Sequence, residues 1–276
     1  MTAAQARFFD SASVPIRYIE LGRGEPVVLV HSYTGTFESQ FVRSGFAGAV
    51  AQRYRVVGFD LRGHGQSGKP HDPACYGREM ALDVVRLLDH LAIPRAHMLG
   101  YSLGAHILVQ LLTLHPERFV TAILGGGAGR RRWSAEHEAR AEEEARELEQ
   151  GGMEKQILRL WPADAPRPDQ ARLRELSRRY LAGNDTRALA AMRRANGDQV
   201  ASDAALAAVH VPVLGIAGTQ DPYLAGLRDL TAIVPDMHVV AIQGATHDAA
   251  AARPEFLQAV LEFLAGHTAG DSSAAT

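Results

Sequence analysis

The chain lacks most of the features that mark a specialised class of protein. Its 276 residues contain a single cysteine, Cys75, which excludes an intramolecular disulfide and a metal site built from cysteines. The net charge of −2 gives no general attraction to nucleic acid or to an anionic membrane. No apolar run is long enough to cross a bilayer, and the first residues lack the basic and apolar segments of a secretory signal. We therefore expect a cytoplasmic protein without a nucleic-acid or membrane partner.

The composition that remains is that of an ordinary globular protein. Hydrophobic residues make up 46% of the chain and charged residues 22%. A chain of this length can bury a large core, either as one big domain or as a domain that carries an insertion.

Apolar stretches with strand character alternate with stretches of helical periodicity over most of the chain. We expect strands at residues 7–10, 16–21, 26–31, 55–60, 97–101, 120–124, 211–217 and 238–242. We expect helices at residues 40–53, 77–91, 103–115, 224–233 and 253–263. The run Val-Val-Leu-Val inside 26–31 is typical of a strand that is buried on both faces. The pattern predicts an α/β fold, with a mostly parallel sheet and helices on both of its faces.

Residues 130–201 interrupt this alternation. They contain no strand-like run and hold 15 of the 29 basic and 13 of the 31 acidic residues, with helices expected at 135–149, 170–181 and 186–196. We interpret them as a helical cap on a core formed by residues 1–129 and 202–265. We expect the tail, residues 266–276, to be disordered.

Ser102 lies between two glycines in the pattern Gly-x-Ser-x-Gly, after an apolar stretch and before a helical one. This is the setting in which a serine is held on a sharp strand-to-helix turn with its hydroxyl exposed. By chance the motif occurs in about one chain in ten of this composition, so other residues must support the interpretation.

Two further residues complete a possible catalytic set. His247 follows the last expected strand, and Asp221 follows the strand at 211–217. Taken alone, each is more often a turn or surface residue. Their order along the chain, Ser, Asp, His, and their places at the carboxyl ends of strands favour a triad of nucleophile, orienting carboxylate and base.

A nucleophilic serine also needs donors for the oxyanion that forms when it attacks a carbonyl. The residue after the nucleophile, Leu103, would supply one backbone N–H. The loop His31–Gly35 follows a buried strand, and Tyr33 within it would supply the other. A polar strand-to-helix turn without this role is the simpler interpretation of the loop alone.

Five segments together resemble the α/β-hydrolase superfamily, in particular its capped serine hydrolases and esterases. They are His31–Gly35, Asp60–Ser67, Gly100–Gly104, Gly218–Asp221, and His247 with the segment Arg253–Phe256. The resemblance implies an eight-stranded sheet with a helical cap after strand six, and the triad Ser102, Asp221 and His247. The chain departs from the family at Ser32, because this loop usually carries a glycine after its histidine.

The remaining histidines and the cap have competing interpretations. We expect His31 and His64 to hold loops, Asp60 to support the turn after it, and His106, a rival base by spacing, to pack within its helix. Several cap residues could line a substrate pocket or only pack the cap onto the sheet: Trp133, Met153, Ile157, Leu158, Leu160 and Trp161. Ser32, Trp133 and Trp161 are our pocket candidates.

The expected function is hydrolysis of a small-molecule ester, without a metal or cofactor because no ligand cluster or phosphate-binding glycine loop is present. Carbon–carbon bond hydrolases, lactonases, thioesterases and perhydrolases resemble this chain equally. A lyase acting on cyanohydrins and a non-catalytic ligand-binding protein of the same fold also remain open. A serine nucleophile argues against epoxide hydrolases and haloalkane dehalogenases, which use aspartate at this position.

Overall fold

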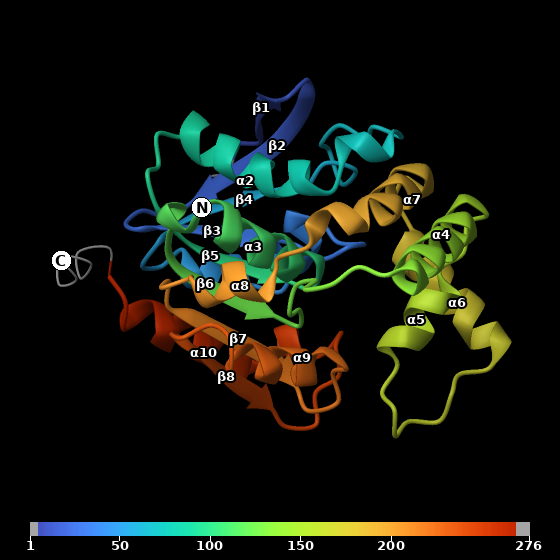
Figure 1. The fold of residues 1–276 in the computed structure, drawn as a ribbon. Helices are drawn as coiled ribbons and strands as arrows, with labels where there is room; N and C mark the ends of the chain where they lie inside the picture. Colours follow the sequence, from blue (N-terminus) through green and yellow to red (C-terminus); the bar gives the residue numbers. More distant parts are fainter. Residues whose placement is uncertain (1–4, 269–276) are drawn as a thin grey trace.

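The computed structural model describes residues 5–268. Its strands form one eight-stranded sheet (Figure 1). The strands are β1 (Arg7–Ser11), β2 (Val14–Leu21), β3 (Pro26–Val30), β4 (Arg55–Phe59), β5 (Ala96–Tyr101), β6 (Phe119–Gly125), β7 (Val213–Gly218) and β8 (Met237–Ile242). Their order is β1-β2-β4-β3-β5-β6-β7-β8, and all pairs from β4 onward are parallel. Only β1 with β2 and β2 with β4 are antiparallel. The predicted α/β architecture is confirmed.

Helices cover both faces of the sheet. The helices outside the stretch between β6 and β7 are α1 (Phe46–Val50), α2 (Arg78–His90), α3 (Leu103–Leu114), α9 (Tyr223–Leu230) and α10 (Pro254–Ala265). One apolar cluster contains α2, α3 and α9 and the other contains α1 and α10. Along β3, Val28 and Val30 belong to the first cluster, and Val27 and Leu29 belong to the second. All four are fully buried, so this strand is packed on both faces as its sequence predicts.

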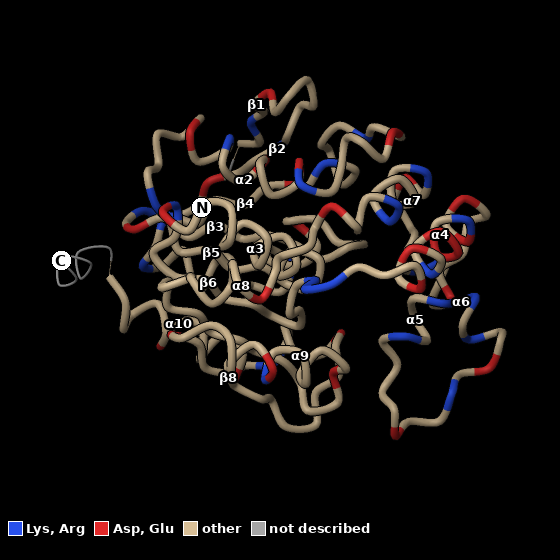
Figure 2. Tube along the Cα trace, in the orientation of Figure 1, with Lys and Arg blue, Asp and Glu red and all other residues tan. Residues whose placement is uncertain are grey.

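Between β6 and β7 the chain forms a group of helices beside the sheet (Figure 1). They are α4 (Ala135–Glu149), α5 (Glu154–Leu160), α6 (Gln170–Leu181) and α7 (Thr186–Arg194), followed by α8 (Asp203–Ala207). We keep the name cap for residues 130–201. Arg130 and Val200 form an isolated parallel bridge, so the cap leaves and rejoins the core at one place. Charged residues of both signs gather on the cap helices (Figure 2).

Two sequence predictions were wrong in detail. The helix expected at 40–53 is a π-helical turn, Glu38–Val42, followed by the short α1. Gly45 separates them because its φ of +79° is incompatible with a continuous helix. The short helices α5 and α8 were not expected from their sequences. The predicted disordered tail lies, apart from residues 266–268, outside the described residues.

No helix within residues 5–268 is both long and apolar enough to cross a bilayer. The polar segments that the sequence analysis singled out all follow strand ends at one edge of the sheet. The His31 loop follows β3, Ser102 follows β5, Asp221 follows β7 and His247 follows β8. In open parallel sheets, ligands bind at this carboxyl edge.

Candidate active site

Ser102 occupies a strained turn between β5 and α3. Its φ is +53° and its ψ is −108°, an unusual backbone conformation for a residue with a side chain. Its N–H donates to the carbonyl of Gly125 at 2.7 Å, and its carbonyl accepts from the N–H of His106 at 3.1 Å. These two bonds hold the turn, because they fix Ser102 to β6 on one side and to α3 on the other.

The glycines of the motif are required by close packing around this turn. A Cβ at Gly100 would lie 2.3 Å from the carbonyl carbon of Gly104, and a Cβ at Gly104 would lie 2.2 Å from the carbonyl oxygen of Val30. Backbone atoms cannot move away as a flexible side chain can. The pattern Gly-x-Ser-x-Gly therefore reflects the close approach of α3 to β3 and β5.

Gly104→Ala should reduce the free energy of unfolding by about 3 kcal/mol or more, because the new methyl group would overlap a backbone carbonyl. Gly48→Ala is the matched control, since a Cβ there meets nothing within 4 Å and Gly48 lies in α1. That control should be neutral or stabilise by up to about 1 kcal/mol. Urea denaturation measures both. Equal stability of the two variants would contradict the packing argument.

The side chains of Ser102, His247 and Asp221 form a continuous hydrogen-bonded chain. His247 Nε2 lies 3.0 Å from Ser102 Oγ, and His247 Nδ1 lies 2.9 Å from Asp221 Oδ2. The second oxygen of Asp221 accepts the N–H of Tyr223 at 2.9 Å. With Nδ1 donating to the carboxylate, Nε2 is left to accept the hydroxyl proton of Ser102. His247 and Asp221 are almost completely buried, whereas Ser102 is partly accessible.

Three residues that were not expected from the sequence, Tyr101, Gly126 and Gly127, pack against Ser102, His247 and Asp221. The hydroxyl of Tyr101 donates to the carbonyl of His247 at 2.5 Å. A Cβ at Gly126 would lie 3.1 Å from both Asp221 Oδ2 and His247 Cε1, and a Cβ at Gly127 would lie 2.7 Å from the carbonyl of Ser102. The glycines after β6 therefore allow the backbone to pack closely against Ser102, Asp221 and His247. In the sequence, the cluster of glycines was the one sign of this packing.

The loop after β3 presents two backbone donors near Ser102. Within residues 5–268, neither the N–H of Tyr33 nor that of Leu103 donates to a protein acceptor. Leu103 begins α3, where the first N–H groups have no partner within the helix. Tyr33 and Ser102 line the same cavity. Both N–H groups are therefore available to a ligand.

Two buried histidines hold this loop in place. His31 donates from Nδ1 to the carbonyl of Ser32 at 2.8 Å and accepts the N–H of Leu61 at Nε2, at 2.9 Å. His64 Nε2 donates to the carbonyl of Tyr33. Ser32 is not among the residues with positive φ, so its backbone conformation does not demand glycine. Asp60 accepts from the N–H of Gln66 at 3.0 Å, within the turn that follows it.

Burial, together with the charge of the neighbouring His64, lowers the pKa of His31 from 6.5 to about 3. The unfolded chain takes up a proton at His31 below pH 6.5, whereas the folded chain does so only near pH 3. The contribution of neutral His31 to the free energy of unfolding is therefore fully present above pH 6.5 and is lost as the pH falls toward 3. We expect the free energy of unfolding to drop by about 2 kcal/mol from this residue between pH 7.5 and pH 5. Urea titrations at the two pH values test this, and equal stabilities would contradict it.

His106, the rival base, does not contact the hydroxyl of Ser102. Its ring lies against Tyr223, with centroids 5.2 Å apart, and lines a different cavity from Ser102. Burial holds the pKa of His106 well below its usual range, with Arg130 and Arg159 adding to the effect. His247 is the histidine placed against the serine.

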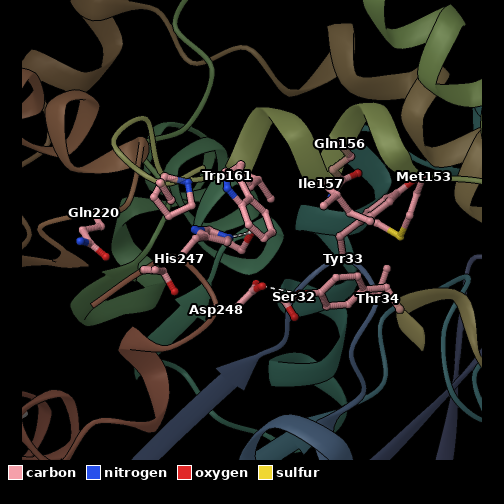
Figure 3. A pocket seen from close by; sticks show the side chains of 16 residues that line it. Ser32, Tyr33, Thr34, Met153, Gln156, Ile157, Trp161, Gln220, His247 and Asp248 are labelled. Atoms are coloured by element: carbon pink, nitrogen blue, oxygen red, sulfur yellow. Dashed lines mark hydrogen bonds between the residues drawn. The ribbon is translucent and has the colours of Figure 1, made fainter. Parts of the chain in front are cut away.

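A cavity of about 350 Å³ lies above Ser102, between the core and the cap. Its apolar wall comes from the cap: Met153, Ile157, Leu160, Trp161, Pro162 and Ala165. Its polar wall contains Ser32, Thr34, Gln156, Tyr180, Gln220 and Asp248. Figure 3 shows Met153, Ile157 and Trp161 in the upper part of the view and Ser32, Thr34 and Asp248 in the lower part. Residues 5–268 contain no group of metal-ligand side chains.

Of the three pocket candidates, Ser32 and Trp161 line this cavity and Trp133 does not. Trp133 lines a second cavity instead. Its ring stacks on His137 at 5.6 Å, and its Nε1 donates to Glu138 at 2.5 Å, so contacts at the start of α4 fix it away from Ser102. The polar residues Gln156, Tyr180, Gln220 and Asp248 were not expected, because they belong to segments far apart in the chain.

Comparison with known proteins places this geometry in a family. A profile of the α/β-hydrolase fold matches residues 25–252. The chain is 29% identical to 3-oxoadipate enol-lactonase 2 from Acinetobacter baylyi, over 76% of this chain and 77% of the lactonase. It is 35% identical to an acetyltransferase component of the acetoin cleaving system from Pseudomonas putida, over 41% of this chain, but the match spans only 30% of that protein.

Solved structures are similar over nearly the whole chain. A thermophilic esterase from Thermogutta terrifontis superposes with a TM-score of 0.78 at 21% identity, covering 96% of this chain and all of the esterase. A hydrolase from Pseudomonas aeruginosa superposes with a TM-score of 0.75 at 26% identity, covering 95% of this chain and 99% of that chain. With the fold, the profile and these superpositions in agreement, the chain belongs to the α/β-hydrolase superfamily.

Proposed function

We propose that this chain is a serine hydrolase that cleaves a carboxylic ester, or a related acyl bond, of a small uncharged molecule. The hydrogen-bonded chain from Ser102 through His247 to Asp221, at the base of a cavity, is the observation that carries the proposal. In this account residues 130–201 act as a cap over the substrate. The chemistry needs no metal or cofactor.

The proposed reaction has two halves. His247 takes the proton of Ser102 at Nε2 while Oγ bonds to the substrate carbonyl carbon, and Tyr33 and Leu103 donate their N–H groups to the oxyanion. The ester C–O bond then breaks, and His247 returns the proton to the leaving alcohol. Water attacks the acyl-enzyme with His247 again as base, which releases the acid and restores the serine. Asp221 fixes the tautomer of His247 and stabilises its charged form.

The charge of the cavity favours a neutral substrate. No lysine or arginine is among its lining residues, and Asp248 contributes a carboxylate. A relative from Metapseudomonas resinovorans, 28% identical over 45% of this chain, hydrolyses a substituted hexa-2,4-dienoic acid. An acid of that kind would meet Asp248 here without a cation in the wall. This supports an ester or an uncharged lactone over carbon–carbon cleavage of such acids.

A pair of p-nitrophenyl esters tests this preference. The butyrate ester should have a kcat/KM about fivefold to tenfold above that of the hemisuccinate ester, which has a similar size and a negative charge. Asp248→Asn should narrow the difference, since it removes the carboxylate and keeps the shape. Equal rates for the two esters, or faster turnover of the charged one, would contradict the proposed substrate class. An uncharged lactone measured alongside distinguishes lactone from linear ester.

A further inference from the structure

A second cavity, of about 480 Å³, lies where the cap joins the core. Its lining shares no residue with the cavity above Ser102. Helix α5 lies between the two, because Gln156 and Ile157 line the first cavity and Arg159 lines the second. The core contributes Gly129, His106 and Tyr223, and the cap contributes the arginines and the carboxylate of the lining.

Positive charge dominates this second cavity. Six arginines line it, namely Arg130, Arg131, Arg132, Arg140, Arg159 and Arg193, together with a single carboxylate, Glu144. Glu144 lies 3.2 Å from Arg159 and 3.0 Å from Arg193, so one carboxylate serves two guanidinium groups. Burial opposes ionisation of Glu144, but these two arginines hold its pKa below the usual range. The one carboxylate of this cavity is therefore already paired with two arginines.

Among the described residues, three of the other arginines have no carboxylate within ion-pair distance, although the charge of Glu144 acts on Arg130 and Arg140. Arg130 donates to the neutral side chain of Gln199 at 2.7 Å. Within residues 5–268, no carboxylate forms an ion pair with Arg130, Arg132 or Arg140. Burial lowers the pKa of Arg130 to about 10, and Arg193 and Arg159 repel its charge. The stretch Arg130–Arg132 leads from the sheet to α4 (Figure 2).

An unpartnered buried group lies in the same cavity. His106 is 6% exposed, and its Nδ1 has no hydrogen-bond partner. A buried polar atom without a partner costs free energy, so such atoms in folded proteins usually face a ligand or water. This observation is independent of the arginines, since His106 comes from α3 in the core.

We propose that this second cavity binds a small oxyanion, a carboxylate or phosphate group, at the junction of cap and core. The guanidinium group of arginine binds a carboxylate or a phosphate through paired N–H donors. An anion in this cavity would offset the positive charges of Arg130, Arg132 and Arg140, which form no ion pair in the part of the chain that the structure describes. The site is separate from Ser102, so the proposal does not depend on the proposed function. An anion held there would contact residues of both the cap and the core.

The two tryptophans of the chain make the test direct, because each lines one cavity. Trp161→Phe leaves Trp133 as the reporter of the second cavity, and Trp133→Phe leaves Trp161 as the reporter of the first. Each variant is titrated with inorganic phosphate and with succinate, and sodium chloride keeps the ionic strength constant. We expect a saturable change in the fluorescence of Trp133 and none in that of Trp161.

Arginine variants locate the site within the Trp161→Phe background. Arg140→Gln and, separately, Arg132→Gln should weaken anion binding by about tenfold, the effect of losing a charged hydrogen-bonding partner. Arg146→Gln is the matched control, because Arg146 lies on the same helix, is exposed and pairs with Glu142. It should bind as the parent does.

Saturation by phosphate alone supports a phosphorylated ligand, and saturation by succinate alone supports a carboxylate ligand. Saturation by both anions supports a general oxyanion site. Absence of a saturable response with either anion would overturn the proposal. So would a response confined to Trp161, or equal binding by Arg140→Gln, Arg132→Gln and Arg146→Gln.

Discussion

Replacing Ser102 with alanine should lower kcat/KM for p-nitrophenyl butyrate by about four to six orders of magnitude. The hydroxyl oxygen is the atom that bonds to the carbonyl carbon, and within residues 5–268 no other side-chain oxygen lies in hydrogen-bond contact with His247 Nε2. The N–H groups of Tyr33 and Leu103 would remain, so a small rate above that of water should persist. Thermal unfolding measured alongside establishes that the variant is folded.

Ser44→Ala provides the matched control for this experiment. Ser44 is exposed and, among the residues that the structure describes, forms hydrogen bonds only within its own turn, so its variant should retain the parent rate. A Ser102→Ala enzyme that is folded and retains more than about a tenth of the parent activity would contradict the role given to Ser102.

Asp221→Asn should lower kcat by about four orders of magnitude while leaving the fold intact. The amide has the shape of the carboxylate, but its NH2 group can present a donor to His247 Nδ1. That arrangement favours the tautomer with a proton on Nε2, which then cannot accept from Ser102. Steady-state rates with a neutral ester measure the loss.

Asp89→Asn is the control for this second variant, because Asp89 is exposed on α2 and pairs with Arg118. It should leave the rate unchanged. If folded Asp221→Asn loses less than about tenfold, the carboxylate does not orient His247 and the proposed arrangement is wrong.

Much of the fold and of the candidate site could be predicted because both depend on local signals. The buried run of β3 and the alternation of strand and helix patterns predict a parallel sheet, and they do so without long-range information. Ser102, Asp221 and His247 each follow a strand end, and parallel strands bring these ends to one edge. The glycines of the serine motif marked the turn, although the reason for them, contact with β3, is visible only in three dimensions.

The cap was predicted less well, because its contacts join distant segments. Helix α5 has seven residues and no capping side chain, so its sequence carries little helical signal. Both tryptophans were expected in one pocket, but which wall each one lines depends on how the cap helices pack. Asp248 and Tyr180 meet through a hydrogen bond across 68 residues, and no periodicity in the sequence predicts such a pair.

The most direct test of the central claim is covalent labelling with a fluorophosphonate, followed by mass spectrometry of the peptides. An activated serine attacks this reagent, so we expect one adduct, on Ser102, that is absent in Ser102→Ala and slower to form in Asp221→Asn. Absence of an adduct, or an adduct on another residue, would contradict a nucleophilic Ser102. Absence would instead support a ligand-binding protein of the same fold.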